Sequence, residues 1–100
     1  MKLTLLGTGC PSIDYKRCGS ANLIRSKKTK ILIDCGSGVT QRLNQSGHSS
    51  ASIDALLLTH LHTDHVIDLY QLIISSWHSD RDSIWKIYGP KGTKKFVDQI

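Results

Sequence analysis

Residues 53–77 place the strongest constraint on what this chain can fold into. Ile53–Thr59 is a nearly all-apolar run, as expected for a strand that is covered on both faces of a sheet. A polar segment, residues 60–65, follows it directly. Beyond that segment, apolar residues recur at the spacing of one buried helix face: Val66, Leu69, Tyr70, Ile73, Ile74 and Trp77. A strand that leads through a polar loop into a helix predicts an α/β arrangement in which helices cover a sheet.

The remaining sequence adds further short strands and helices to this unit. Shorter apolar runs predict strands at Leu3–Leu6, Ala21–Arg25, Lys30–Asp34 and Ile84–Tyr88, the middle two forming a hairpin, and residues 10–19 predict a loop. Gly36-Ser37-Gly38 opens a helix that stops at Gly47, with Ser37 as its N-cap, and Thr93 caps a last helix. No Gly, Asn or Pro follows that last helix, so we expect the chain to be the front part of a longer protein.

Size and charge narrow the class of protein. One hundred residues make one domain, and no stretch approaches the length of a membrane span. The formal net charge of +5 is compatible with a polyanionic partner such as nucleic acid, and equally with a merely soluble basic surface. Three cysteines without a CxxC pair indicate a reduced, cytoplasmic compartment.

The polar segment itself is His60-Leu61-His62-Thr63-Asp64-His65. Imidazole nitrogens and carboxylate oxygens are ligands for zinc and similar ions. His60 and His62 lie two apart, so in an extended segment both point to one side and reach one ion. Asp64 and His65 follow where the chain turns into the helix and could hold a second ion, as in two-metal hydrolytic sites. The alternative is a group of surface histidines in a loop.

Several motifs resemble those of the metallo-β-lactamase-fold hydrolases. Residues 60–65 match their HxHxDH signature. Leu6-Gly7-Thr8-Gly9, Ile33-Asp34-Cys35-Gly36-Ser37-Gly38 and Gly89-Pro90-Lys91-Gly92 are similar, in order, to elements of the ribonuclease Z branch. Ser37 stands where many ribonuclease Z sequences carry glutamate, which keeps the phosphodiesterase- and arylsulfatase-type relatives open.

The resemblance implies a fold and a set of roles. The family fold is an αββα four-layer sandwich, of which residues 1–100 would be the N-terminal half, a mixed sheet with covering helices. His60 and His62 would bind a first zinc ion, and Asp64 and His65 a second. Asp64 would also orient or deprotonate the attacking water, and Asp34 would support the ligands from beneath.

The resemblance also implies a reaction. It is zinc-dependent phosphodiester hydrolysis, most similar to the 3′-end processing of precursor tRNA by a cytoplasmic endonuclease that is usually a homodimer. Two alternatives stay open: a related hydrolase of small phosphate or sulfate esters, and a non-catalytic fragment. The resemblance places the remaining zinc ligands in the second half of the sandwich, so this chain alone would bind zinc weakly and catalyse poorly.

Overall fold

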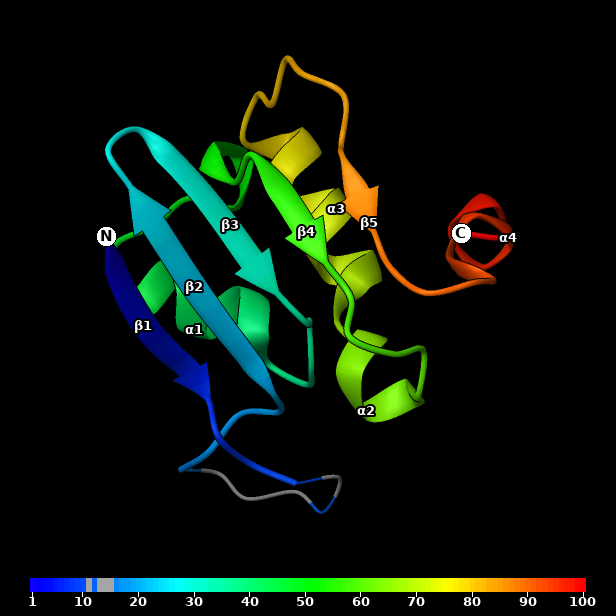
Figure 1. Ribbon diagram of the computed structural model, residues 1–100. Helices are drawn as coiled ribbons and strands as arrows, with labels where there is room; N and C mark the ends of the chain where they lie inside the picture. The colour runs from blue at the N-terminus through cyan, green and yellow to red at the C-terminus, as the bar shows by residue number, and fades with distance from the viewer. Residues whose placement is uncertain (11, 13–15) are drawn as a thin grey trace.

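The computed structural model describes residues 1–10, 12 and 16–100. Part of the predicted loop 10–19, namely residues 11 and 13–15, lies outside the described residues. The described residues form a mixed sheet with strand order β1-β2-β3-β4-β5 (Figure 1). The strands are β1 (Lys2–Gly7), β2 (Ala21–Ser26), β3 (Thr29–Ile33), β4 (Ala55–Leu57) and β5 (Ile87–Tyr88). The first three pair antiparallel, whereas β3, β4 and β5 run parallel, so the predicted mixed sheet is present.

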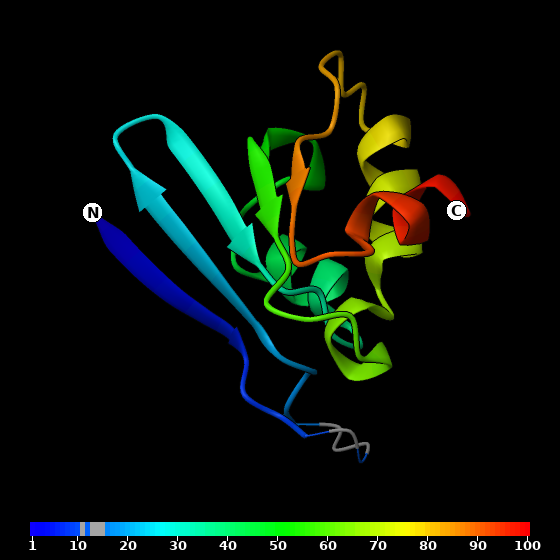
Figure 2. The same cartoon turned by 45° about the vertical axis from the view of Figure 1, so that its right-hand side comes forward.

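The helices gather on one side of this sheet, as Figure 2 shows. They are α1 (Val39–Gln45), the short 3₁₀ helix η1 (Ser50–Ser52), α2 (Thr63–Val66), α3 (Leu69–His78) and α4 (Thr93–Asp98). Fully buried leucines of the sheet meet fully buried side chains of α1 and α3 in one core: Leu23, Leu32, Leu56, Val39, Leu43, Leu69 and Leu72. Burial of each such side chain contributes about 1.5–3 kcal/mol, which fixes the helices against the sheet.

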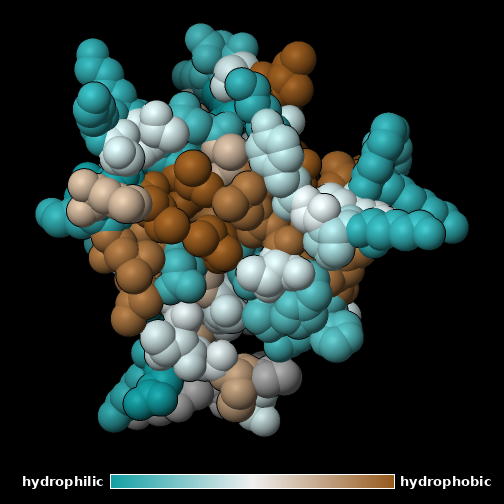
Figure 3. Space-filling model, in the orientation of Figure 1, coloured by the Kyte–Doolittle hydropathy of each residue, from teal (hydrophilic) through white to brown (hydrophobic). Residues whose placement is uncertain are grey.

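The other face of the sheet is not covered by any helix of the described residues. Leu3 of β1 is paired with Ile24 of β2, and Leu5 with Asn22. Because paired residues share a face of the sheet and alternate residues of a strand point the same way, both leucines lie on this uncovered face. We call it the open face, and its apolar members are Leu3, Leu5, Ile24, Ile31, Ile33, Ala55, Leu57 and Tyr88. Leu3 is 61% exposed and Leu5 64% exposed, and the space-filling view shows an apolar patch over the strands (Figure 3). The strand predicted over residues 53–59 is present but shorter, since β4 spans Ala55–Leu57, and among the described residues only Leu56 of β4 is fully buried.

Two details of the helices also differ from the predictions. Ser37 is not the N-cap of α1, because Gly38 holds that position with a left-handed φ of 77°. The backbone N–H of Thr40 instead donates to the carboxylate of Asp68 at 2.7 Å. Asp68 stands between α2 and α3, so the single helix predicted after the polar segment is two helices.

The buried face of α3 differs from the face that the apolar spacing predicted. Leu69, Leu72 and Ser76 are the buried residues of α3. Trp77, which the apolar spacing assigned to the core, is 73% exposed. It shares an outward stripe with three other exposed apolar residues, Ile67, Tyr70 and Ile74. None of the helices among the described residues has the length and hydropathy needed to cross a membrane.

Candidate metal centre

The candidate centre forms where β3 and β4 end side by side. These strands are parallel, so the residues that follow them emerge at the same edge of the sheet. Asp34 follows β3, and its backbone N–H donates to the carbonyl of Leu57, the last residue of β4. The polar segment 60–65 follows β4. Sheet topology thus brings residues from two distant parts of the sequence to one place.

Backbone contacts hold these two segments together. The N–H of Cys35 donates to the carbonyl of His65, and the carbonyl of Cys35 accepts from the N–H of Asp68. Gly36 lies so close to the same loop that an added Cβ would be 2.8 Å from the Asp64 carbonyl oxygen and 2.5 Å from the Ser20 nitrogen. Glycine is therefore required here by close approach of backbone to backbone, which explains why a glycine follows Cys35.

The predicted ligands come together. One ligand atom from each of His60, His62 and Asp64 lies within 4.8 Å of the others, a spacing that a single metal ion could span. The rings of His60 and His62 have centroids 4.8 Å apart and are nearly perpendicular. This grouping brings Asp64 together with the two histidines that are predicted to face one ion.

His65 lies at the side of this trio. Its ring centroid is 4.0 Å from that of His60, and its Nε2 is 3.4 Å from the Oδ2 of Asp64. Asp64 therefore lies near His65 and also near the other two histidines, where it could contribute an oxygen to either of two ions. The four side chains do not splay apart, and their assignment as ligands stays a prediction.

Asp34 lies beside the predicted ligands and contacts one of them, His65. Its side chain is 5% exposed, and its Oδ2 is 2.9 Å from the Nδ1 of His65. Its Oδ1 accepts the backbone N–H of Thr59 at 2.8 Å, and its Oδ2 accepts the Thr59 hydroxyl at 2.8 Å. Asp34 has a left-handed φ of 64°, a conformation that aspartate tolerates better than most residues. A buried carboxylate of this kind fixes the orientation of the groups that donate to it.

Cys35 and Thr59 are two further polar residues beside Asp34. Cys35 is fully buried. Burial raises the pKa of its thiol far above the ordinary value, and the nearby carboxylates of Asp68 and Asp34 add to that shift. Cys10, by contrast, is exposed. Thr59 was not singled out from the sequence, because a threonine at the end of an apolar run carries no signal of its own.

The other two histidines lie outside the centre. His78 is the exposed last residue of α3. His48 is largely buried, and its Nδ1 has no hydrogen-bond partner among the described residues. Burial lowers the pKa of His48, and the nearby cations Lys30 and Arg25 lower it further. Neither histidine belongs to the group of potential metal ligands found among the described residues.

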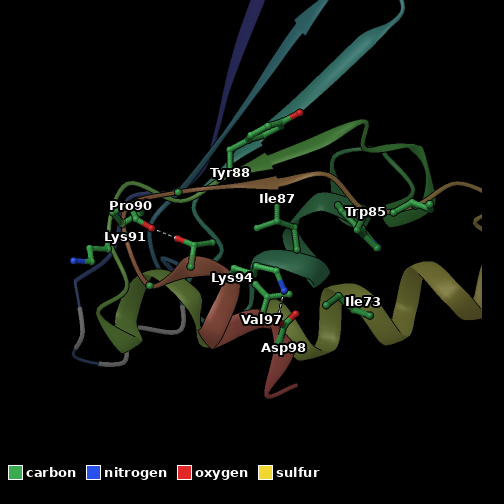
Figure 4. Close-up of a pocket in the computed structure, with 13 residues that line it drawn as sticks. Ile73, Trp85, Ile87, Tyr88, Pro90, Lys91, Lys94, Val97 and Asp98 are labelled. Carbon is green, nitrogen blue, oxygen red and sulfur yellow. Dashed lines mark hydrogen bonds and ion pairs between the residues drawn. The ribbon is translucent and has the colours of Figure 1, made fainter.

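A separate hollow of about 670 Å³ lies on the far side of β5, between that strand, α3 and α4 (Figure 4). Apolar side chains of Ile73, Trp85, Ile87 and Val97 line it. Its one ion pair, Lys94 with Asp98, joins two residues of α4 at 2.6 Å. None of the predicted metal ligands lines this hollow, so the chemistry-bearing side chains and the apolar cavity are separate features.

Comparison with known proteins agrees with this geometry. Residues 1–97 match the family described as "Anti-Pycsar protein Apyc1". The chain belongs to that family. It is also 41% identical over 103 residues to the ribonuclease Z of Mycobacterium marinum, covering all of this chain and 37% of that protein.

Solved structures show the same fold. Human tRNase Z, short form, superposes with a TM-score of 0.89 at 32% identity, over 99% of this chain and 39% of that one. The metallo-β-lactamase fold protein YhfI from Bacillus subtilis gives a TM-score of 0.84 at 25% identity, over 97% of this chain and 39% of that one. The chain thus has the metallo-β-lactamase fold, and the predicted resemblance to ribonuclease Z is confirmed. It spans somewhat more than a third of the length of these relatives.

Proposed function

We propose that this chain is part of a zinc-dependent phosphodiester hydrolase that acts on precursor tRNA, as a ribonuclease Z does. The observation that carries the proposal is the convergence of His60, His62, Asp64 and His65 at the carboxyl edge of the parallel strands. The likeness to human tRNase Z, short form, supports RNA as the substrate class. The free cysteines among the described residues support a reduced, cytoplasmic setting.

The donor set fits zinc. Three imidazoles and one carboxylate are ligands of the type that zinc prefers, and they lie within reach of one another. His60 and His62 would hold one ion, and Asp64 and His65 the other. When bound, zinc stabilises negative charge on phosphoryl oxygens and lowers the pKa of a water molecule. Asp64 would orient the attacking water and accept its proton, and Asp34 would keep the His65 ring in place.

We also propose that residues 1–100 are the N-terminal half of one metallo-β-lactamase-fold domain. The open face supports this view, because a soluble protein rarely leaves a patch of this kind uncovered. The apolar hollow beside β5 supports it too, since β5 is the last strand of the described sheet and has a free edge. A second sheet packed on the open face would give the four-layer sandwich.

Basic side chains near the centre are consistent with an RNA partner. Lys91 follows β5 and so lies at the same edge of the sheet as the polar segment. The neighbouring Gly92 lies beside Leu61 of that segment, since a Cβ built on Gly92 would be 3.5 Å from the Leu61 side chain. Lys27 and Lys28 lie instead at the tip of the β2–β3 hairpin, toward the opposite edge. They suit edge protection better than contact with a substrate at the centre.

The stripe formed by Ile67, Tyr70, Ile74 and Trp77 is consistent with the proposed homodimer. A contact of this kind would bury side chains that are now 49–73% exposed. Light scattering on the purified protein and on Trp77→Asp measures the oligomeric state. A dimer that becomes a monomer in the variant is expected, and an unchanged mass would contradict this use of the stripe.

The function is tested by turnover and by metal content. The purified full-length protein is offered precursor tRNA, bis(p-nitrophenyl) phosphate and an aryl sulfate, each with and without zinc. Cleavage of the RNA at the 3′ side of the acceptor stem supports the proposal, whereas turnover of the small esters alone would replace it with an ester hydrolase. Zinc content is measured for the wild type and for the double variant His60→Ala plus His62→Ala. Equal zinc in both proteins would remove the ligand assignment and favour a non-catalytic role.

A further inference from the structure

A chain of hydrogen bonds joins the buried carboxylate to a predicted ligand through Thr59. The Thr59 hydroxyl donates to the Oδ2 of Asp34 at 2.8 Å. The same hydroxyl oxygen is 3.0 Å from the Nδ1 of His60. The Thr59 backbone N–H also donates to the other oxygen of Asp34 at 2.8 Å, so the residue is held at two points.

The positions of the protons follow from counting donors. An ionised carboxylate only accepts, so the single hydroxyl proton of Thr59 points to Asp34. The hydroxyl oxygen then has only lone pairs to offer to His60, and the Nδ1 of His60 must supply the proton. If Thr59 donated to His60 instead, no proton would lie between the Thr59 oxygen and the carboxylate at 2.8 Å.

We propose that Thr59 is a positioning residue that holds His60 as the Nδ1-protonated tautomer with its Nε2 lone pair free for a metal ion. The step from Asp34 to His65 is direct, since Nδ1 of His65 is 2.9 Å from the same Oδ2. One carboxylate oxygen therefore sets the tautomer of two histidines, one directly and one through the threonine. This inference rests on the proposed metal centre for its purpose, although the tautomer itself exists without an ion.

The geometry explains why a threonine or serine is needed at this position. Valine has the same shape but neither donates nor accepts, so Thr59→Val would leave the Nδ1 of His60 without its partner. The His60 ring could then rotate or take the other tautomer, and its Nε2 would no longer be presented consistently. Because Thr59 is exposed, a water molecule can partly replace its hydroxyl as the partner of His60. We therefore expect a loss of zinc affinity near the lower end of the range that is usual for residues hydrogen-bonded to a metal ligand.

A matched control is available in α1. The hydroxyl of Thr40 is buried and has no hydrogen-bond partner among the described residues. Thr40→Val makes the same chemical change as Thr59→Val in a place where no hydrogen bond is lost. Thr59→Ser keeps the hydroxyl and serves as the conservative variant.

The first measurement uses the metal-free protein. Nitrogen-15 NMR of the imidazoles, at a pH well above the ordinary histidine pKa, distinguishes the two neutral tautomers. We expect His60 to be Nδ1-protonated in the wild type, in Thr59→Ser and in Thr40→Val, and to show a mixture in Thr59→Val. A wild-type His60 protonated at Nε2, or an unchanged tautomer in Thr59→Val, would overturn the proposal.

The second measurement is zinc affinity, by competition with a chelating dye. We expect binding about 10-fold weaker in Thr59→Val and unchanged in Thr59→Ser and Thr40→Val. Affinity that falls equally in both valine variants would overturn a specific role for Thr59. A wild type that binds no zinc would contradict the proposed function, while the tautomer of His60 in the metal-free protein still decides the role of Thr59.

Discussion

Asp34→Asn is the most informative single change in this chain. The substitution keeps the size of the side chain and suits the left-handed backbone at this position, where φ is 64°. An amide has one oxygen, which can still accept the N–H of Thr59. Its NH₂ group replaces the Oδ2 that now meets the Thr59 hydroxyl and the Nδ1 of His65. The Thr59 hydroxyl and the His65 N–H, both donors, would therefore face the NH₂ group of the asparagine, which is also a donor.

The size of the effect follows from which of these donors can find another partner. The Thr59 hydroxyl is exposed and can turn to accept from the amide or to bind water. The His65 ring is 19% exposed, and it can keep a bond to the new amide only by moving its proton from Nδ1 to Nε2, which replaces a bond to a charged group with one to a neutral group. A hydrogen bond to a charged group contributes about 1.5–3 kcal/mol, so Asp34→Asn should lower the free energy of unfolding by about 2 kcal/mol. Asp34→Ala also loses the bond from the Thr59 N–H and places alanine at a positive φ, for a total of about 4 kcal/mol.

Urea unfolding of the purified protein, followed by circular dichroism, measures these differences if the slopes stay equal. Asp54→Asn is the control, because the exposed carboxylate of Asp54 also accepts a backbone N–H, from Lys30 at 2.7 Å. We expect that variant to lose at most about 1 kcal/mol. If the free energy of unfolding of Asp34→Asn lies within about 0.5 kcal/mol of the wild-type value, or falls no more than that of Asp54→Asn, the reasoning that this carboxylate holds His65 in place is refuted.

Three other predictions use features outside the proposed ligands. Because the folded protein lowers the pKa of His48, the unfolded chain binds this proton more readily. The stability linked to neutral His48 is fully present above the ordinary pKa near 6.5 and is lost as the pH falls below it. In urea unfolding, His48→Asn should therefore make the free energy of unfolding depend less on pH in this range. An equal pH dependence in the variant and the wild type would contradict the prediction. Exposed Cys10 should react with a thiol reagent in the native protein, whereas Cys35 should react only on unfolding, as mass spectrometry of the labelled peptides would show. Gly36→Ala should cost about 2 kcal/mol of stability and weaken zinc binding, since its Cβ would push against the backbone of Asp64; a variant with unchanged melting would contradict this.

The sequence predicted the candidate ligands and most of the strands, because both depend on local patterns. Residues 60–65 form a motif within a single loop, and each strand is a short apolar run bounded by polar residues. The hairpin of β2 and β3 lies where the two runs predicted it. These features need no knowledge of how distant segments meet.

What sequence reasoning missed depends on contacts between distant segments. Asp68 accepts the N–H of Thr40 across 28 residues, and this contact accounts for a cap that Ser37 was expected to provide. Trp77 points outward because Leu69, Leu72 and Ser76 form the buried face of α3, and the apolar spacing alone did not show which face the sheet covers. The role of Thr59 depends on Asp34, 25 residues away, being the neighbour that the parallel pairing of β3 and β4 supplies.

The same contacts indicate how the centre is pre-arranged before any ion binds. Without Asp34, the polar segment would be an exposed loop whose histidines sample many rotamers and both tautomers. With it, His65 is held directly, and the same carboxylate accepts the Thr59 hydroxyl that lies beside His60. The ordering of these rings is therefore part of folding and need not be repeated when an ion arrives, which lowers the entropy cost of binding it. Residues placed over the open face could add further ligands from above, but the orientation of these histidines is set from below by the sheet itself.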